Sequence, residues 1–318
     1  MATPESVLSA EHRFVLTSGA LKLNVAPGKG NRAAVMGVLN VTPDSFSDGG
    51  LFLDTMQAVT RAGEMIRDGA SIIDVGGASS RPTGSTYGKG ALKIAPEVES
   101  ERIGPVIREI SSQWPGVMIS VDTFTASVAR HALDAGAHIV NDITALRSDL
   151  GMASLIAERN VPVILMHSIG DPGEMPHSRP CKNVVESVRT SLQEAINHAL
   201  EAGIRQLVVD PGFGFGKSTA DNLKLISAIR EFVSLGWPVL VGVSRKSSIG
   251  RVLGSEEEPV PVSDRLYGSL GATAVAVLEG ATIIRTHDVR ATFDMLKVLD
   301  VSRPSEHQRS RYRNELRG

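Results

Sequence analysis

Polar side chains recur at one kind of position in this 318-residue sequence, at or just after the end of short apolar runs. A carboxylate or an amide inside an apolar run costs free energy unless a partner or a ligand satisfies it. The residues that share this position are Asn40, Ser80, Arg81, Asp122, Asn141, Asp142, His167, Asp210, Ser244, Arg245, Lys246, Arg285 and His287. Because the runs have the length of buried strands, we expect these side chains to converge at one end of a sheet and to bind a polar ligand there.

Part of this set suits a flat heterocycle. Asp122, Asn141 and Asp210 offer hydrogen-bond acceptors and one amide group, which match a ring that carries several N–H donors. Lys246 could form an imine with a carbonyl substrate, clamp an anion or donate a hydrogen bond. These residue types therefore indicate a small planar ligand and leave the role of Lys246 open among the three.

Another part of the set suits a phosphate group. The residues that could hold it are Ser80, Ser244, Arg285 and His287. The last three follow the seventh and eighth apolar runs, where α/β barrels often bind phosphate. Asn40 offers a hard oxygen that could coordinate Mg2+ if a substrate diphosphate supplied the other ligands.

Eight short apolar runs alternate with stretches of helical periodicity along the chain. The runs occupy residues 35–41, 71–76, 117–122, 138–142, 161–166, 207–210, 239–243 and 282–285. They do not alternate apolar and polar residues, so both faces of each strand should be buried. Eight strand–helix repeats predict an α/β fold, a closed (βα)8 TIM barrel, and an open doubly wound sheet is the alternative.

Segments outside these repeats complete the predicted organisation. Apolar residues on both sides of Ser18 and Gly19 predict a β-hairpin that closes the bottom of the barrel. We therefore expect an N-terminal extension with this hairpin (1–30), the barrel (31–300) and a basic flexible tail (301–318).

Three helix features follow from single residues. Asp221 is expected to cap the start of a helix, and Gly203 is expected to end one in the left-handed conformation. Gly268 and Gly271 share one helix, which they would destabilise unless another helix packs closely against them.

Bulk composition narrows the choice of partners. The net charge of −2 argues against a protein that mainly binds the nucleic-acid backbone, and the 42% hydrophobic content is enough for a large core. The single cysteine, Cys181, excludes an internal disulfide and is typical of a reducing compartment. No signal-peptide pattern and no membrane-length apolar run is present. We therefore expect a cytoplasmic protein that binds neither nucleic acid nor a membrane.

Several motifs, read together, resemble one known family. The first two signatures of the dihydropteroate synthase family are similar to residues 36–50, MGVLNVTPDSFSDGG, and 72–82, IIDVGGASSRP. Shorter motifs at 120–123, 141–143, 210–217, 244–247 and 285–288 follow in the order expected of that family. The resemblance covers roughly residues 32–299. It implies a TIM-barrel transferase of folate biosynthesis, which joins (7,8-dihydropterin-6-yl)methyl diphosphate to p-aminobenzoate and gives 7,8-dihydropteroate and diphosphate.

The resemblance also implies roles for individual residues. Its pterin-holding positions are Asp122, Asn141, Met166, Asp210 and Lys246. Its diphosphate-contacting positions are Asn40, which also binds Mg2+, Ser80, Arg285 and His287. The positions expected around p-aminobenzoate and any competing sulfonamide are Phe46, Asp48, Arg81, Pro82, Phe215 and Ser247.

The family reaction needs no protein nucleophile. Catalysis is expected to rest on Asn40, Lys246, Arg285 and His287, which would stabilise the departing diphosphate and hold the reactants in line. On this reading Lys246 binds substrate and forms no imine.

Two departures from the family pattern concern the second substrate. Ala78 stands where an acidic residue is common, and residues 83–93 resemble an insertion in the loop that follows the second strand. They leave the affinity for p-aminobenzoate and the response to sulfonamides open.

Two alternative functions remain open, and so does the oligomeric state. A pterin-binding methyltransferase barrel would share the pterin-holding residues without needing Ser80, Arg285 and His287. A catalytically silent pterin-binding paralogue would be consistent with Ala78. The family is typically homodimeric, and the helix that carries Gly268 could form such an interface.

Overall fold

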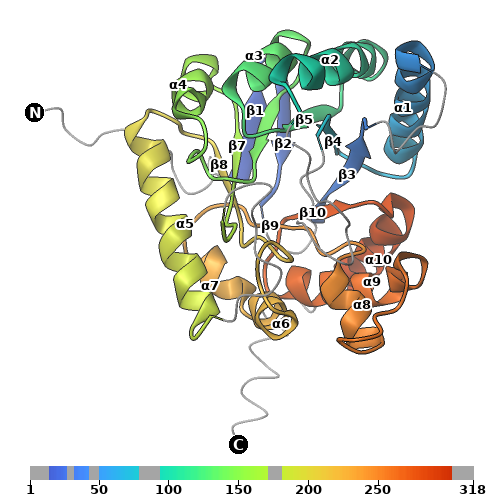
Figure 1. The fold of residues 1–318 in the computed structure, drawn as a ribbon, viewed down its shortest axis with the longest axis vertical. Helices are drawn as coiled ribbons and strands as arrows, with labels where there is room; N and C mark the ends of the chain where they lie inside the picture. Colours follow the sequence, from blue (N-terminus) through green and yellow to red (C-terminus); the bar gives the residue numbers. More distant parts are fainter. Residues whose placement is uncertain (1–13, 27–31, 43–49, 79–93, 171–180, 303–318) are drawn as a thin grey trace, which may run out of the picture.

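A computed structural model describes residues 14–26, 32–42, 50–78, 94–170 and 181–302. Eight parallel strands follow one another around a barrel: β3 (Ala34–Asn40), β4 (Ile72–Gly76), β5 (Met118–Asp122), β6 (Ile139–Asp142), β7 (Val163–Met166), β8 (Leu207–Asp210), β9 (Leu240–Val241) and β10 (Ile283–Thr286). β10 pairs with both β3 and β9, and a parallel bridge from Val209 to Val239 joins β8 to the segment leading into β9. The sheet is closed, which confirms the predicted TIM barrel and excludes the open sheet (Figure 1).

Helices form a ring outside the barrel (Figure 1). They are α1 (Gly50–Arg67), α2 (Pro96–Gln113), α3 (Ala126–Asp134), α4 (Leu150–Arg159), α5 (Val184–Glu201), α6 (Thr219–Ser227), α7 (Ile229–Val233), α8 (Ser247–Leu253), α9 (Leu266–Leu278) and α10 (Val289–Ser302), with a 3-10 turn, η3 (Val262–Arg265), before α9. Within the described ranges, no helix is both long and apolar enough to cross a lipid bilayer.

Two apolar layers bury the two faces of the strands. Inside the barrel, every strand contributes to a single cluster, which contains Met36, Ile72, Met118, Ile139, Ile164, Val208, Leu240 and Ile283, with Ala34 as a second residue from β3. Outside, residues of opposite strand parity, such as Val35, Ile73 and Ile119, pack against the helices. Burial on both faces explains why the runs show no polar alternation.

The N-terminal hairpin closes the bottom of the barrel, as predicted. Its strands, β1 (Val15–Ser18) and β2 (Leu21–Asn24), pair antiparallel, and Gly19 makes the turn at a φ of 57°. Leu16 is 1% exposed and belongs to the inner cluster of the barrel. The side chain of Gln206 fixes the hairpin to the barrel because its oxygen accepts from Thr17 N and its nitrogen donates to Thr17 O.

The helix predictions had mixed outcomes. Gly203 follows α5 at a φ of 92°, as predicted. The prediction for Asp221 was wrong, because Ser218 is the N-cap of α6 and its hydroxyl accepts from Asp221 N. Asp221 lies in the first turn of the helix, where its negative charge interacts favourably with the helix dipole. The two glycines of α9 differ. A Cβ on Gly268 would lie 2.7 Å from Ile249 Cγ2 of α8, whereas one on Gly271 would meet nothing within 4 Å.

Truncation of Leu16 tests whether the hairpin contributes to the barrel core. We expect Leu16→Ala to lower the free energy of unfolding by about 2–5 kcal/mol, because it leaves a cavity under the inner layer. Urea denaturation followed by circular dichroism measures the change. The control is Lys22→Ala, on the exposed side of the same hairpin, which should stay within about 0.5 kcal/mol of the parent protein. Equal stability of the two variants would show that the hairpin packs loosely on the barrel.

Candidate functional site

Strand periodicity places most of the predicted residues at one end of the barrel interior. Side chains two or four positions after the inner apolar layer point to the same face as that layer. The residues at these positions are Asn40, Asp74, Asp122, Asn141, Met166, Asp210, Ser244, Arg285 and His287. Except for Asp74, which lies in mid-strand, they lie near or just beyond the C-terminal ends of their strands, the end at which barrel enzymes place their chemistry.

An ion-pair network around Arg285 occupies the middle of this ring. Arg285 Nε donates to Asp74 Oδ2 at 2.6 Å, and Arg285 Nη2 donates to Asp122 Oδ2 at 2.8 Å. Asn141 Nδ2 also donates to Asp74 Oδ2, at 3.2 Å. One guanidinium and one carboxylate thus connect β10, β4, β5 and β6 across the barrel.

Asp74 is a site residue that the sequence analysis missed. Its side chain is fully buried, and its Oδ1 has no hydrogen-bond partner among the described residues. It lies in mid-strand rather than at a strand end, so a search of strand ends passes over it. The available signal was parity, because Asp74 lies two residues after the inner-layer residue Ile72.

Burial sets the protonation of the carboxylates. It raises the pKa of Asp122 to about 7, while the charge of Arg285 acts in the opposite direction. Burial also raises the pKa of Asp210. The Gly212 N–H donates to Asp210 Oδ1 at 2.7 Å, and this hydrogen bond acts in the opposite direction. The pKa of Arg285 lies above its ordinary value, because Asp74 and Asp122 outweigh the effect of its burial.

The loop after β8 is tightly turned and presents an aromatic ring to Lys246. Gly212, Gly214 and Gly216 all have positive φ, and Lys217 Nζ donates to Gly212 O at 2.7 Å inside the loop. Phe215 is buried, and Lys246 Nζ lies 3.9 Å from the centre of its ring, at cation–π distance. Burial lowers the pKa of Lys217 to about 7, with Asp210 opposing the shift.

Met166 forms an apolar wall beside the polar ring. It packs in a small buried cluster with Ile143 and Phe215, against which Phe124 also packs. Such a wall next to acidic and amide side chains is suited to a flat ring with polar edges.

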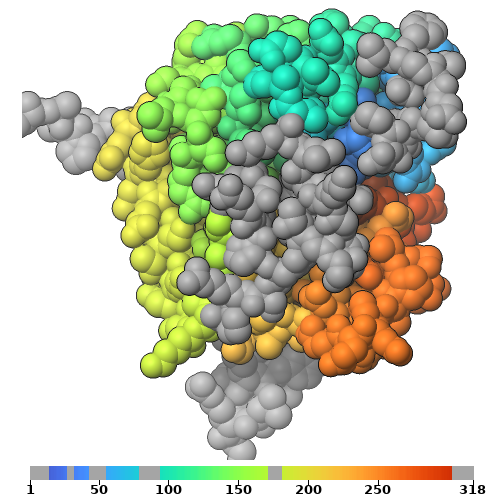
Figure 2. Space-filling model, viewed as in Figure 1, coloured from blue at the N-terminus to red at the C-terminus, as the bar shows by residue number. Residues whose placement is uncertain are grey.

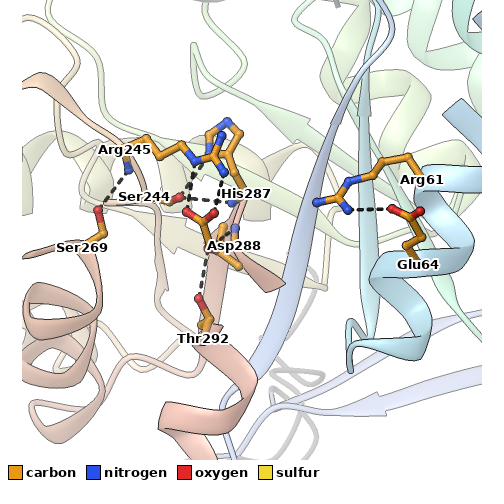
Figure 3. A network of polar contacts seen from close by, with 9 residues as sticks. Arg61, Glu64, Ser244, Arg245, Ser269, His287, Asp288 and Thr292 are labelled. Atoms are coloured by element: carbon orange, nitrogen blue, oxygen red, sulfur yellow. Dashed lines mark hydrogen bonds and ion pairs between the residues drawn. The ribbon is translucent and has the colours of Figure 1, made fainter. Parts of the chain in front are cut away.

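His287 is hydrogen-bonded to Ser244, in the segment after β9. Ser244 Oγ lies 3.1 Å from His287 Nδ1 and accepts from the His287 backbone N–H at 3.1 Å (Figure 3). Burial lowers the pKa of His287 to about 3, and the charges of Arg285, Arg245 and Lys246 act in the same direction. The imidazole is therefore neutral at neutral pH in the ligand-free site.

Three strand-end residues lie outside the ligand ring, and one of them, Arg245, is 42% exposed and pairs with Asp288. Asp142 has the opposite parity to Asn141, and its carboxylate accepts from Thr144 N and Leu146 N, so it stabilises the turn after β6. His167 is buried, and burial followed by the charges of Lys217 and Arg147 lowers its pKa to about 3. Its Nδ1 has no hydrogen-bond partner among the described residues.

Of the remaining predicted residues, two lie within the described ranges and five lie outside them. A Cβ on Gly76 would lie 3.8 Å from both Asn40 Oδ1 and Asp122 Oδ2, so Asn40 lies near the carboxylate. Ser247 is buried at the start of α8. Outside the described residues lie Phe46, Asp48, Ser80, Arg81 and Pro82.

Known proteins resemble this chain over most of its length. The family model described as "Pterin binding enzyme" matches residues 36–287. The dihydropteroate synthase of Mycobacterium leprae is 44% identical over 269 residues, which cover 83% of this chain and 92% of that protein.

Two solved structures share the fold. The dihydropteroate synthase of Xanthomonas albilineans with 4-aminobenzoic acid is 41% identical, with a TM-score of 0.80, over 92% of this chain and 99% of that one. The dihydropteroate synthase of Yersinia pestis in a sulfonamide drug complex is 38% identical, also with a TM-score of 0.80, over 91% of this chain and 98% of that one.

Proposed function

The chain belongs to the dihydropteroate synthase family of transferases, and we propose how its residues carry out the family reaction. The substrates are (7,8-dihydropterin-6-yl)methyl diphosphate and p-aminobenzoate, and the products are 7,8-dihydropteroate and diphosphate. The observation that supports this assignment most directly is the hydrogen bond between Arg285 and Asp122 in one buried network, because an acceptor suited to a pterin then lies beside a cation suited to a diphosphate.

The pterin ring is held by the acidic and amide side of the site. Asp122, Asn141 and Asp210 provide acceptors and an amide along the edge of the ring, and Lys246 donates a hydrogen bond to it. Met166 covers one face of the ring within its apolar cluster.

The diphosphate is held by Asn40, Ser80, Arg285 and His287. We assign Mg2+ to Asn40 together with oxygen atoms of the diphosphate. This donor set fits, because the amide oxygen of Asn40 lies near the Asp122 carboxylate in the ligand ring, and Mg2+ prefers a few such hard oxygens together with substrate phosphates. When bound, the ion would neutralise negative charge on the leaving group.

The reaction breaks the bond between the pterin methylene carbon and the diphosphate oxygen, and the arylamine nitrogen then bonds to that carbon and loses a proton. Arg285 and His287 face the departing oxygens, while Asp122 and Asp210 stabilise positive charge that develops on the pterin. Lys246 orients the ring and forms no covalent bond to it, because no step requires a protein nucleophile.

The p-aminobenzoate side is assigned to Phe46, Asp48, Arg81, Pro82, Phe215 and Ser247. Of these, Phe215 and Ser247 lie within the described residues, on the loop and the helix that flank Lys246. The Yersinia pestis relative is a sulfonamide drug complex, and we propose that sulfonamides compete for the same place in this chain.

Turnover decides between synthase and silent paralogue. With pterin diphosphate, p-aminobenzoate and Mg2+, we expect stoichiometric dihydropteroate and diphosphate, detected by chromatography and a coupled diphosphate assay. Chelation of Mg2+ should suppress turnover, and a sulfonamide should compete with p-aminobenzoate. Pterin binding without product would indicate the silent paralogue. Methyl transfer to or from a reduced pterin, with no diphosphate released, would indicate the methyltransferase barrel.

The titration of Asp122 gives pterin binding a pH dependence. A pKa of about 7 in the ligand-free site means that lowering the pH protonates a carboxylate that must accept N–H bonds from the ring. From about pH 8 to about pH 6 the affinity should fall, by at most about tenfold per pH unit below the pKa. Calorimetric titration with pterin diphosphate, without p-aminobenzoate, measures this dependence.

The variant Asp122→Asn identifies the titrating group. It should weaken pterin binding roughly ten- to a hundredfold at about pH 8 and remove most of the pH dependence, because a charged acceptor is lost. The matched control is Asp134→Asn, an exposed residue at the end of α3, which should retain the parent profile. A parent affinity that does not change with pH would show that another group accepts from the ring.

We also propose a homodimer that forms through the outer face of α6, α8 and α9. A largely apolar groove of about 320 Å3 runs between these helices, lined among others by Leu223, Ile249, Val252, Gly268 and Val275. Part of this face, formed by α8 and α9, is visible in orange in Figure 2. The occupant is a second copy, an assignment that the family supports.

A charge placed on that face should separate the subunits. Light scattering should give the parent protein about twice the 33.8 kDa chain mass. Val275→Glu should give monomers, because Val275 is 43% exposed and a carboxylate would be buried in the interface. Val298→Glu, equally apolar and 64% exposed on α10, is the control and should remain dimeric. A dimeric Val275→Glu variant would place the interface elsewhere.

A further inference from the structure

We propose that the Arg245–Asp288 ion pair is a clamp that positions Lys246 and His287 for the transfer reaction, an inference that rests on the proposed function. Neither residue of the pair is assigned to substrate. Arg245 immediately precedes Lys246, and Asp288 immediately follows His287, so each member of the pair adjoins one proposed substrate-binding residue.

The clamp lies where the sheet ladder between β9 and β10 has ended. These strands pair only at Ile283 with Leu240 and at Ile284 with Val241. Beyond that point, side chains join the two segments. Arg245 Nε donates to Asp288 Oδ2 at 3.0 Å and Arg245 Nη2 to Asp288 Oδ1 at 2.5 Å, beside the contacts between Ser244 and His287 (Figure 3).

The backbone of Arg245 is held in a conformation that a non-glycine residue rarely adopts. Its φ is 60°, in the left-handed region. Its N–H donates to Ser269 Oγ at 3.1 Å, and its carbonyl accepts from Arg265 Nη1 at 3.0 Å. Arg265 is itself buried and also donates to Val260 O. Both backbone polar groups of Arg245 are therefore fixed by α9 and by the turn before it.

This fixed conformation sets the direction in which Lys246 leaves the backbone. Lys246 returns at once to extended geometry, with φ −63° and ψ 150°, as the N-cap of α8. The side-chain Nζ of Lys246 then lies over the ring of Phe215. A change at Arg245 would rotate this side chain away from the pterin position, and a displacement of about 1 Å can lower a rate by about a hundredfold.

Stability alone does not account for the pair. The Arg245 side chain is 42% exposed, and ion pairs with such exposure contribute little to folding. The bidentate geometry instead fixes orientation, because two parallel bonds to one carboxylate prevent rotation of the guanidinium plane. The pair thus has the properties of a positioning device rather than of a stabilising contact.

The test is a double-mutant cycle with steady-state kinetics. Arg245→Gln and Asp288→Asn should each raise KM for pterin diphosphate about tenfold or more and lower kcat, with a smaller effect on KM for p-aminobenzoate. The double variant should be no worse than either single variant, because each single change already opens the clamp. Arg245→Lys, which keeps the charge without the planar fork, should resemble Arg245→Gln.

Two further measurements separate positioning from other causes. Urea denaturation should show parent-like stability for all these variants. Arg61→Gln breaks a comparably exposed ion pair, with Glu64 of α1, and should leave every kinetic constant unchanged (Figure 3). Calorimetric titration with inorganic diphosphate should show weaker binding in the clamp variants, and this readout does not depend on turnover of the parent protein.

Three outcomes would overturn the proposal: kinetic constants equal to the parent values, losses that add independently in the double variant, or a loss explained by unfolding. Absence of turnover in the parent protein would instead contradict the proposed function, and the diphosphate titration would then still report on the clamp.

Discussion

The bridge from Arg285 to Asp74 and Asp122 is the constraint on which the rest of the site depends. It brings a guanidinium and two carboxyl groups into a mostly buried place, where the cost of desolvation is large and is offset only by close pairing. Removing either carboxylate would leave the buried Arg285 guanidinium without one of its two partners, so the network holds β4, β5 and β10 in fixed relation. The ligand ring is therefore preorganised before any ligand enters.

Much of this site can be read from the sequence once strand parity is applied. The eight apolar runs locate the strands, but because both of their faces are apolar, only the structure shows that the layer from Met36 to Ile283 is the one that faces inward. Counting two or four residues forward selects Asn40, Asp122 and Arg285 as ligand-facing. The same count separates Asn141, which faces the ligand ring, from Asp142, which caps the turn behind it. It would also have selected Asp74, which a search of strand ends omits.

The features that the sequence did not yield depend on contacts between distant segments. Ser218 and Asp221 are both good capping residues, and only the path of the chain after the β8 loop makes Ser218 rather than Asp221 the N-cap of α6. The tie between Arg245 and Asp288 joins residues 43 positions apart. A positive φ at an arginine has no local sequence signal, since it is stabilised by Ser269 and Arg265 rather than by the residue itself.

The two bonds of Arg285 are unequal, and the difference suits the proposed substrate. Nε is bound to Asp74, which is fully buried, whereas Nη2 is bound to Asp122, whose side chain is 10% exposed at the strand end. Under the proposed assignment, a pterin that engages Asp122 competes for the carboxylate held by Nη2, while the bond to Asp74 keeps the guanidinium in the site. The released Nη2 hydrogens then need an acceptor, and the diphosphate of the same molecule supplies one. The energetic cost of separating Arg285 from Asp122 is thereby offset most fully by a ligand that carries both a donor-rich ring and an anionic tail, which therefore binds more tightly than either part alone.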